Sequence, residues 1–135
     1  MLRVVIDPGV LIAAVISRSG APAGLLDRWR DGEFDLVVSP HLLDELEEVL
    51  LRPKFQALVA EDDVRAYAEA LAASGLAFDD ADDPPEVTSD RDDDYLFALA
   101  RASGADAIVS GDRHLTDLAD PPVPVLSPRA LLERL

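Results

Sequence analysis

Two short apolar runs, Val4-Val5-Ile6 ahead of Asp7 and Ala107-Ile108-Val109 ahead of Ser110-Gly111-Asp112, decide the fold of this chain. Each run has the length and composition of a buried strand in a parallel sheet. Helix-like segments separate the two runs along the chain. Parallel strands present their carboxyl ends at one edge of the sheet, so both aspartates are expected at the crevice where alternating β/α folds bind ligands.

The rest of the chain alternates strand-like and helix-like segments, which predicts a three-layer α/β/α sandwich around a mainly parallel sheet. Apolar runs and turn residues predict strands at 3–6, 35–38, 107–110 and 123–126, with a further short strand at 86–87 in an acidic, proline-rich loop. Helical spacing and capping residues predict helices at 10–17, 23–30, 40–51, 62–74, 93–103 and 114–118, and a last helix that begins at Ser127-Pro128.

Composition limits the size and the chemistry of the molecule. With 135 residues, 49% of them hydrophobic, the chain can form one domain with a core and is too short for two typical ones, so residues 1–135 are expected to be a single domain. The absence of cysteine excludes disulfides, zinc fingers and thiol catalysis, and it suits a reducing compartment. The apolar run 10–16 is too short to span a bilayer. A cytoplasmic protein without a membrane partner is therefore expected.

Charge is the main observation against a nucleic-acid partner. The chain carries 12 Lys and Arg residues against 27 Asp and Glu residues, a net charge of −15, whereas phosphate contacts normally require a basic stripe. A local basic rim around the acidic sheet edge could compensate. Its candidate members are Arg18, Arg28, Arg30, Arg52, Lys54, Arg91, Arg113 and His114.

Helical geometry selects two further acids, at about 100° of rotation per residue. On the helix over 42–51, Glu45 borders the apolar stripe, Asp44 and Glu48 point away from it, and Glu47 flanks its opposite border. On the helix over 92–103, Asp93 shares the face of the apolar residues, while Asp94 is expected on the opposite, Arg101 side.

Asp7, Glu45, Asp93 and Asp112 are therefore predicted to meet in one crevice. Clustered carboxylates that do not neutralise one another usually need a cation, and Mg²⁺ and Mn²⁺ suit an oxygen shell that a phosphate completes. This pattern favours phosphodiester hydrolysis by a metal-activated water, without a protein nucleophile. Separate capping roles at helix N-termini are the alternative explanation for Asp7, Asp93 and Asp112.

Five pieces of sequence carry a resemblance to a known family. They are Val4 to Asp7 with Val10-Leu11-Ile12, Val38 to Leu46, Arg52 to Phe55, Asp90 to Ala100, and Ile108 to Asp112. Together they span nearly the whole chain, and their order and spacing are more specific than any piece alone. The chain resembles the PIN-domain ribonucleases, and in particular the toxin components of bacterial toxin-antitoxin pairs.

The resemblance implies a PIN-like fold and a metal-dependent endoribonuclease that hydrolyses RNA. It also implies that Asp7, Glu45, Asp93 and Asp112 form the catalytic acidic quartet and hold Mg²⁺ or Mn²⁺. A cognate antitoxin and a homodimer are the partners that it implies. Where the family usually has Asp-Thr-Asn or Asp-Thr-Ser at the first strand end, this chain has Asp7-Pro8-Gly9, which removes polar groups that help to order the site.

Two other classes of function stay open. A catalytically weakened PIN-like protein could act as an RNA- or protein-binding module, and Gly9 motivates that reading. Phosphotransfer on Asp7 is the third, because receiver domains and aspartate phosphatases also place an Asp at a strand end. The chain lacks the second Asp two residues after a phosphatase nucleophile, so phosphotransfer ranks last.

Overall fold

A parallel sheet forms the centre of the molecule, in a computed structural model that describes residues 1–135 apart from the Arg91 side chain. Within the described residues five strands pair in the order β3-β2-β1-β4-β5. These strands are β1 (Arg3–Ile6), β2 (Asp35–Val38), β3 (Leu76–Ala77), β4 (Ala107–Val109) and β5 (Val125–Leu126). Every neighbouring pair is parallel, and Val5 of β1 lies between Val37 of β2 and Ile108 of β4.

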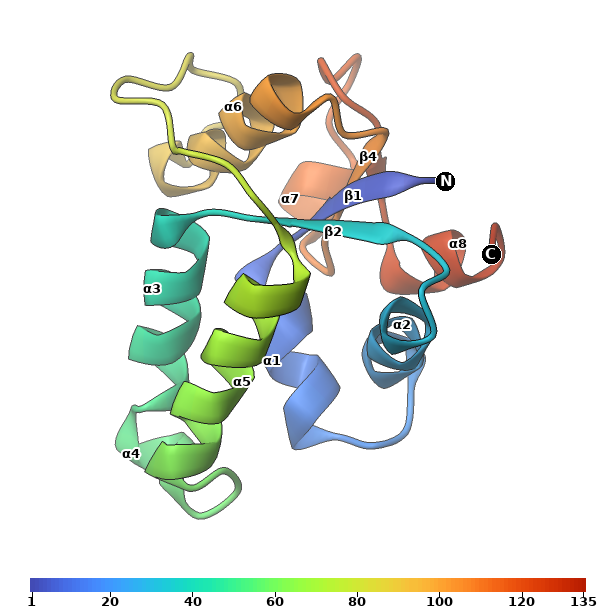
Figure 1. Cartoon of the computed structure of the whole chain (residues 1–135). Coiled ribbons are helices and arrows are strands. Elements are labelled where there is room, and N and C mark those ends of the chain that lie inside the picture. The colour runs from blue at the N-terminus through green and yellow to red at the C-terminus, as the bar shows by residue number, and fades with distance from the viewer.

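Helices cover both faces of this sheet, as Figure 1 shows. They are α1 (Pro8–Ile16), α2 (Ala21–Arg30), α3 (Pro40–Leu50), α4 (Pro53–Gln56), α5 (Glu61–Ser74), α6 (Asp94–Ser103), α7 (Arg113–Thr116) and α8 (Pro128–Leu132), with a 3₁₀ turn η1 at Arg91–Asp93. Helices α1, α2, α3 and α5 pack together in one layer, and α6 packs on β1 and β4 in the other. The predicted three-layer sandwich is confirmed.

The core consists of the strands and the inward stripes of the helices. Val4, Val5, Val37 and Ile108 are completely buried, as expected for central parallel strands that are covered on both faces. On α3 the residues Leu42, Leu46 and Leu50 recur every four positions and are all 0% exposed. This single stripe holds α3 against its neighbours and fixes which of its acids face the sheet edge.

The structure corrects the loop between α5 and α6. The predicted strand at 86–87 is not formed, and the edge strand is β3, immediately after α5. The register with β2 explains the difference, because Val37 pairs with Leu76 as soon as Gly75 ends the helix. Leu76 and Ala77 are too few to show an alternating apolar pattern, and they form a strand because β2 is available as a pairing partner.

Several helix starts also differ from the sequence prediction by one or two residues, and α2, for example, begins at Ala21 rather than at residue 23. Helix α1 begins at Pro8 rather than Val10, since Pro8 occupies the first helical position and Asp7 caps it. A short helix that was not predicted, α4, begins at Pro53, just after α3 ends.

Among the described helices none is by itself both long and apolar enough to cross a bilayer, and α1 with α2 meet the length and composition only as a pair bent by 94°.

Candidate active site

Asp7 lies where β1 ends, and three contacts hold it. Its backbone N–H donates to Val109 O at 2.9 Å, which ties the end of β1 to β4. Its Oδ1 accepts from the Gly9 N–H at 2.9 Å and so caps α1, while its Oδ2 accepts from the Ser110 hydroxyl at 2.9 Å. The carboxylate is therefore fixed at the carboxyl edge of the sheet.

Ser110 links Asp7 to Asp112. The Ser110 side chain is completely buried, and its Oγ accepts from the Asp112 N–H at 3.0 Å while donating to Asp7. Asp112 Oδ1 accepts from the His114 N–H at 2.9 Å and caps α7. The capping role considered for Asp7 and Asp112 is thus present, and it occupies one carboxylate oxygen of each residue. Sequence analysis did not identify Ser110, although its place between the strand and Asp112 was a usable signal.

Asp93 enters the same region from the start of α6. It is half-buried and makes no side-chain capping hydrogen bond, so capping does not account for it. Burial is the main cause that raises its pKa to about 6, with further contributions from the carboxylates of Asp7, Asp90, Asp112 and Glu45. The other three predicted acids, Asp7, Glu45 and Asp112, are therefore close enough to Asp93 to raise its pKa.

Glu45 reaches the cluster from the side, on α3. The Tyr95 hydroxyl donates to Glu45 Oε2 at 3.4 Å. Burial raises the pKa of Glu45, as does Asp7, while His41 and the Tyr95 hydrogen bond lower it. Asp44 and Glu48 on the same helix are exposed, as the helical wheel predicts.

A cleft of about 590 Å³ brings three of the four acids together. Its lining is Asp7, Gly9, Val10, Ala13, Pro22, Asp90, Asp93, Gly111, Asp112 and Pro128. A smaller cavity of about 180 Å³ shares Asp90, Asp93 and Asp112 with it and extends to His114. Glu45 does not line this cleft. Asp90 does, and sequence analysis missed it, although it opens the acidic run ahead of α6.

Asp94 does not lie where the helical wheel put it. It was expected on the outward, Arg101 side of α6, but it is 0% exposed. Its Oδ1 accepts from the backbone N–H groups of Val87 and Thr88, at 3.1 and 2.9 Å. The wheel failed because it considers only the helix, whereas the loop before α6 folds back over its first turn and covers this side.

Three members of the predicted basic rim make other contacts, on α2 and α4, in the part of the chain that the structure describes. Arg28 and Arg30 instead pair with Glu33 and Asp27 at the end of α2, at 2.9 and 4.0 Å. Lys54 lies over the Phe55 ring on α4. His114, another predicted rim member, lines the smaller cavity beside the cleft. Arg113 lies between Asp112 and His114 in the sequence, and the side chain of Arg91 is outside the described residues.

Among the described residues, the cleft acids Asp7, Asp93 and Asp112 take part in none of the ion pairs. In the described part of the chain, the recorded ion pairs join other residues on α2, α5 and their flanks. Carboxylate oxygens are the ligands that Mg²⁺ and Mn²⁺ prefer, so the donor set fits such an ion. Among the described residues, no three His, Asp or Glu side chains are already placed as a metal-binding group. A divalent cation would relieve the electrostatic repulsion that these carboxylates exert on Asp93.

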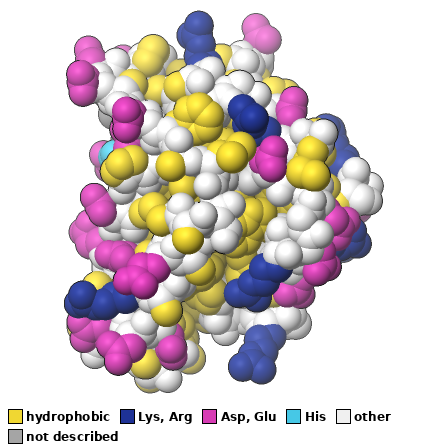
Figure 2. Space-filling view, in the orientation of Figure 1, with side chains coloured by type: hydrophobic (Ala, Val, Ile, Leu, Met, Phe, Trp, Pro, Cys, Tyr) yellow, Lys and Arg dark blue, Asp and Glu magenta, His cyan; other side chains and the backbone are white. Residues whose placement is uncertain are grey.

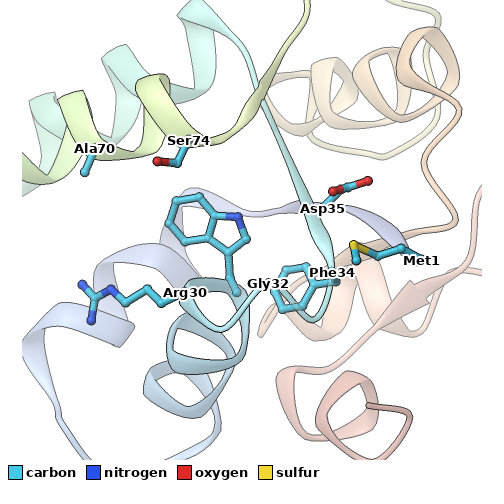
Figure 3. A pocket seen from close by; sticks show the side chains of 8 residues that line it. Met1, Arg30, Gly32, Phe34, Asp35, Ala70 and Ser74 are labelled. Carbon is cyan, nitrogen blue, oxygen red and sulfur yellow. The ribbon is translucent and has the colours of Figure 1, made fainter.

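A second cavity of about 470 Å³ lies away from the cleft, at the amino ends of β1 and β2. Figure 3 shows its lining residues, which are Met1, Trp29, Arg30, Gly32, Phe34, Asp35, Ala70 and Ser74. A neighbouring cavity of about 410 Å³ shares Arg30 and Ala70. The two form what we call the α2–α5 groove, part of an apolar band visible in Figure 2. The α2–α5 groove has one acid in each cavity, Asp35 and Asp63, and so lacks the clustered carboxylates of the cleft.

Comparison with solved structures shows the same fold. VapBC2 from Rickettsia felis bound to a DNA fragment from their promoter has a chain that aligns with a TM-score of 0.63 at 10% identity, over 93% of this chain and 98% of that one. FitAcB from Neisseria gonorrhoeae aligns with a TM-score of 0.58 at 18% identity, over the same shares. PAE2754 from Pyrobaculum aerophilum aligns with a TM-score of 0.63 at 16% identity, over 98% of this chain and 88% of that one.

Comparison of sequences identifies a relative and a family. The uncharacterized protein MJ1680 of Methanocaldococcus jannaschii is 28% identical over 119 residues, which are 88% of this chain and 76% of that protein. The family model of the PIN domain matches residues 3–114, a span that holds all four predicted site acids. This chain therefore belongs to the PIN domain family.

Proposed function

We propose that this protein is a metal-dependent endoribonuclease, the toxin of a toxin-antitoxin pair, that works on RNA in the cytoplasm. The observation that carries the proposal is the cleft that Asp7, Asp93 and Asp112 line together, with none of the three in an ion pair with another described residue. PIN domains are generally ribonucleases, so family membership supports the same reaction class. Placement at the carboxyl edge of a parallel sheet is the usual position of a ligand site in such folds.

The four acids have different positions in this proposal. Asp7, Asp93 and Asp112 line the cleft and would hold Mg²⁺ or Mn²⁺ there, and Glu45 would complete the set from α3. Ser110 orients Asp7 through its hydroxyl. A divalent ion held by these acids supplies Lewis-acid chemistry, which lowers the pKa of a water and stabilises a leaving oxygen at phosphorus. The chain's own residues bind and orient the reacting groups.

A ribonuclease assay tests the proposal. Purified protein with Mn²⁺ is expected to cleave single-stranded or structured RNA, and the variant Asp112→Asn is expected to lose most of that activity. An asparagine can still accept the hydrogen bond from the His114 N–H, so the cap of α7 is kept. Asp44→Asn is the matched control, because Asp44 is an exposed acid that points away from the cleft. Equal cleavage by the wild type and Asp112→Asn would indicate a contaminating nuclease.

A binding module without catalysis is the second candidate function, and Gly9 favours it. Gly9 lines the cleft, where the family resemblance leads one to expect a polar side chain. A Cβ at this position would lie 3.6 Å from Asp7 Oδ1, an ordinary contact, so a larger residue is sterically compatible. If the wild type binds RNA without cleaving it and Gly9→Asn gains activity, the binding-module reading is supported.

An antitoxin is the partner that we propose, together with a second copy of the chain. VapBC and FitAB are toxin-antitoxin systems, and the α2–α5 groove is an exposed apolar surface of the kind that binds proteins. The product of a neighbouring gene should co-purify with this chain. The variant Ala70→Arg, in the groove, should abolish co-purification, whereas Ala72→Arg on the same helix should not. Light scattering of the separated protein measures the homodimer.

A further inference from the structure

His41 and Tyr95 form an aromatic stack next to Glu45. Their ring centroids are 3.9 Å apart and their planes differ by 11°. Tyr95 is buried in α6, with 4% of its surface exposed, whereas His41 in the first turn of α3 is exposed. Tyr95 therefore supports one face of the imidazole and leaves the other accessible to solvent.

This stack lies at the Glu45 side of the acidic cluster. His41 precedes Glu45 by one helical turn, and the Tyr95 hydroxyl donates to Glu45 Oε2 at 3.4 Å. Asp93, which lines the cleft, is two residues before Tyr95 on the same segment. A polymer that places a phosphate near Asp7 and Asp93 would thus carry its neighbouring groups past His41.

The charges around His41 favour an uncharged ligand, such as a nucleobase, over a phosphate. Its backbone N–H donates to Asp80 Oδ2 at 2.9 Å, and Glu45 lies one turn further along α3. Two carboxylates near the imidazole repel an anion. The face of a nucleobase carries no net charge, and unstacked bases of single-stranded RNA bind to aromatic side chains, histidine included.

We propose that His41 is a stacking platform for one nucleobase of single-stranded RNA and that Tyr95 holds its ring in place. This inference rests on the proposed ribonuclease function and adds the form of the substrate. A chain with a net charge of −15 has few cations with which to bind RNA, so stacking supplies affinity that phosphate contacts do not.

Steady-state kinetics separate stacking from the other properties of histidine. His41→Ala is expected to raise KM for a single-stranded oligonucleotide about tenfold with kcat little changed, in line with the energy of base–aromatic stacking. His41→Phe keeps a ring and should restore KM, whereas His41→Gln keeps polarity alone and should not. Rescue by Gln as complete as rescue by Phe, or an unchanged KM in His41→Ala, would overturn the platform.

Proton NMR tests the platform without requiring cleavage. The chain has two histidines, so the variant His114→Ala assigns their imidazole resonances. With Ca²⁺ in place of Mn²⁺ and RNA integrity checked on a gel, an oligonucleotide should shift the His41 resonances upfield, and an abasic oligonucleotide should not. Equal shifts with both, or none, would contradict the proposal. A base-dependent shift without nuclease activity would support the stacking platform and contradict the proposed ribonuclease function. Cleavage of RNA without such a shift would support the ribonuclease function and contradict the platform.

Discussion

At the scale of single residues, Asp93 shows what the clustered acids cost the fold. Its folded pKa of about 6 lies above the ordinary aspartate value of 3.8, so the folded state holds the proton more tightly than the unfolded chain does. The stability contribution of this group is full below about pH 4, is lost as the pH rises to about 6, and stays lost at neutral pH. At pH 7 the charged Asp93 therefore opposes folding unless a cation is bound.

Asp93→Asn is accordingly expected to stabilise the metal-free protein. The gain at pH 7.5 should be about 1 kcal/mol, a value reduced for solvent screening because the residue is only half-buried. Most of the gain should disappear near pH 4, where the wild-type carboxyl is protonated in the folded state and partly protonated in the unfolded chain. Urea unfolding at the two pH values measures both effects, with Asp44→Asn as the exposed control. If Asp93→Asn lowers the free energy of unfolding at pH 7.5, the charged Asp93 does not oppose folding. Mn²⁺ should stabilise the wild type more than the variant.

Ser110 is the second residue whose role can be tested alone. Ser110→Ala removes the hydrogen bond to Asp7 and leaves the Asp112 N–H without its acceptor. We expect a loss of about 1 kcal/mol in unfolding free energy and a 10- to 100-fold weaker Mn²⁺ affinity, as for other residues that orient metal ligands. Calorimetric Mn²⁺ titration measures the second effect. Ser110→Thr keeps a hydroxyl and should retain most of the affinity; equal loss in both variants would argue against orientation of Asp7.

At the scale of elements, α3 is the helix that brings Glu45 and His41 to the site. Three features of the sequence produce it: Ser39 as the cap, Pro40 at the first position and the stripe of Leu42, Leu46 and Leu50. Helix α8 begins with the same Ser-Pro pair, and Ser127 accepts from the Ala130 N–H at 3.1 Å. The two helices differ in length and in burial of the capping residue.

This difference predicts unequal costs for the same substitution. Ser39→Ala should lower the free energy of unfolding by about 1 kcal/mol. The Leu42 N–H donates to Ser39 Oγ at 3.2 Å, and this hydrogen bond is buried, so water cannot replace the hydroxyl. Ser127→Ala, at an exposed residue of a five-residue helix, should cost less because water can replace the hydroxyl. Chemical denaturation of both variants gives the comparison. A larger cost at Ser127 would contradict the argument from burial.

At the scale of the whole molecule, one continuous set of buried side chains runs from β1 to α8. It includes Val4 at the start of the chain and Leu131 near its end. A core that both ends of the chain share should unfold as one unit, which is the single domain expected from the length. Trp29, the one tryptophan, reports on α2, while far-ultraviolet circular dichroism reports on all helices. The two urea transitions should coincide, and separate midpoints would indicate two cooperative units.

Most of the fold follows from local patterns in the sequence. Apolar runs predicted β1 and β2 at their observed bounds and β4 to within one residue, because central parallel strands are buried on both faces and tolerate few polar residues. Capping residues and prolines located α3, α8 and the end of α6 at Gly104, whose φ of +67° favours glycine. The edge strand β3 escaped this reasoning, since two residues beside β2 have no pattern of their own.

The chain alone determined which acids end strands or border apolar stripes, because strand and helix periods are local properties. Only the tertiary structure decided which side chains surround them: that the Ser110 hydroxyl joins Asp7 to Asp112, that Asp90 lines the cleft, and that the loop before α6 buries Asp94. These contacts join residues or segments whose approach depends on the packing of layers and loops. A helical wheel or a strand pattern contains no information about that approach.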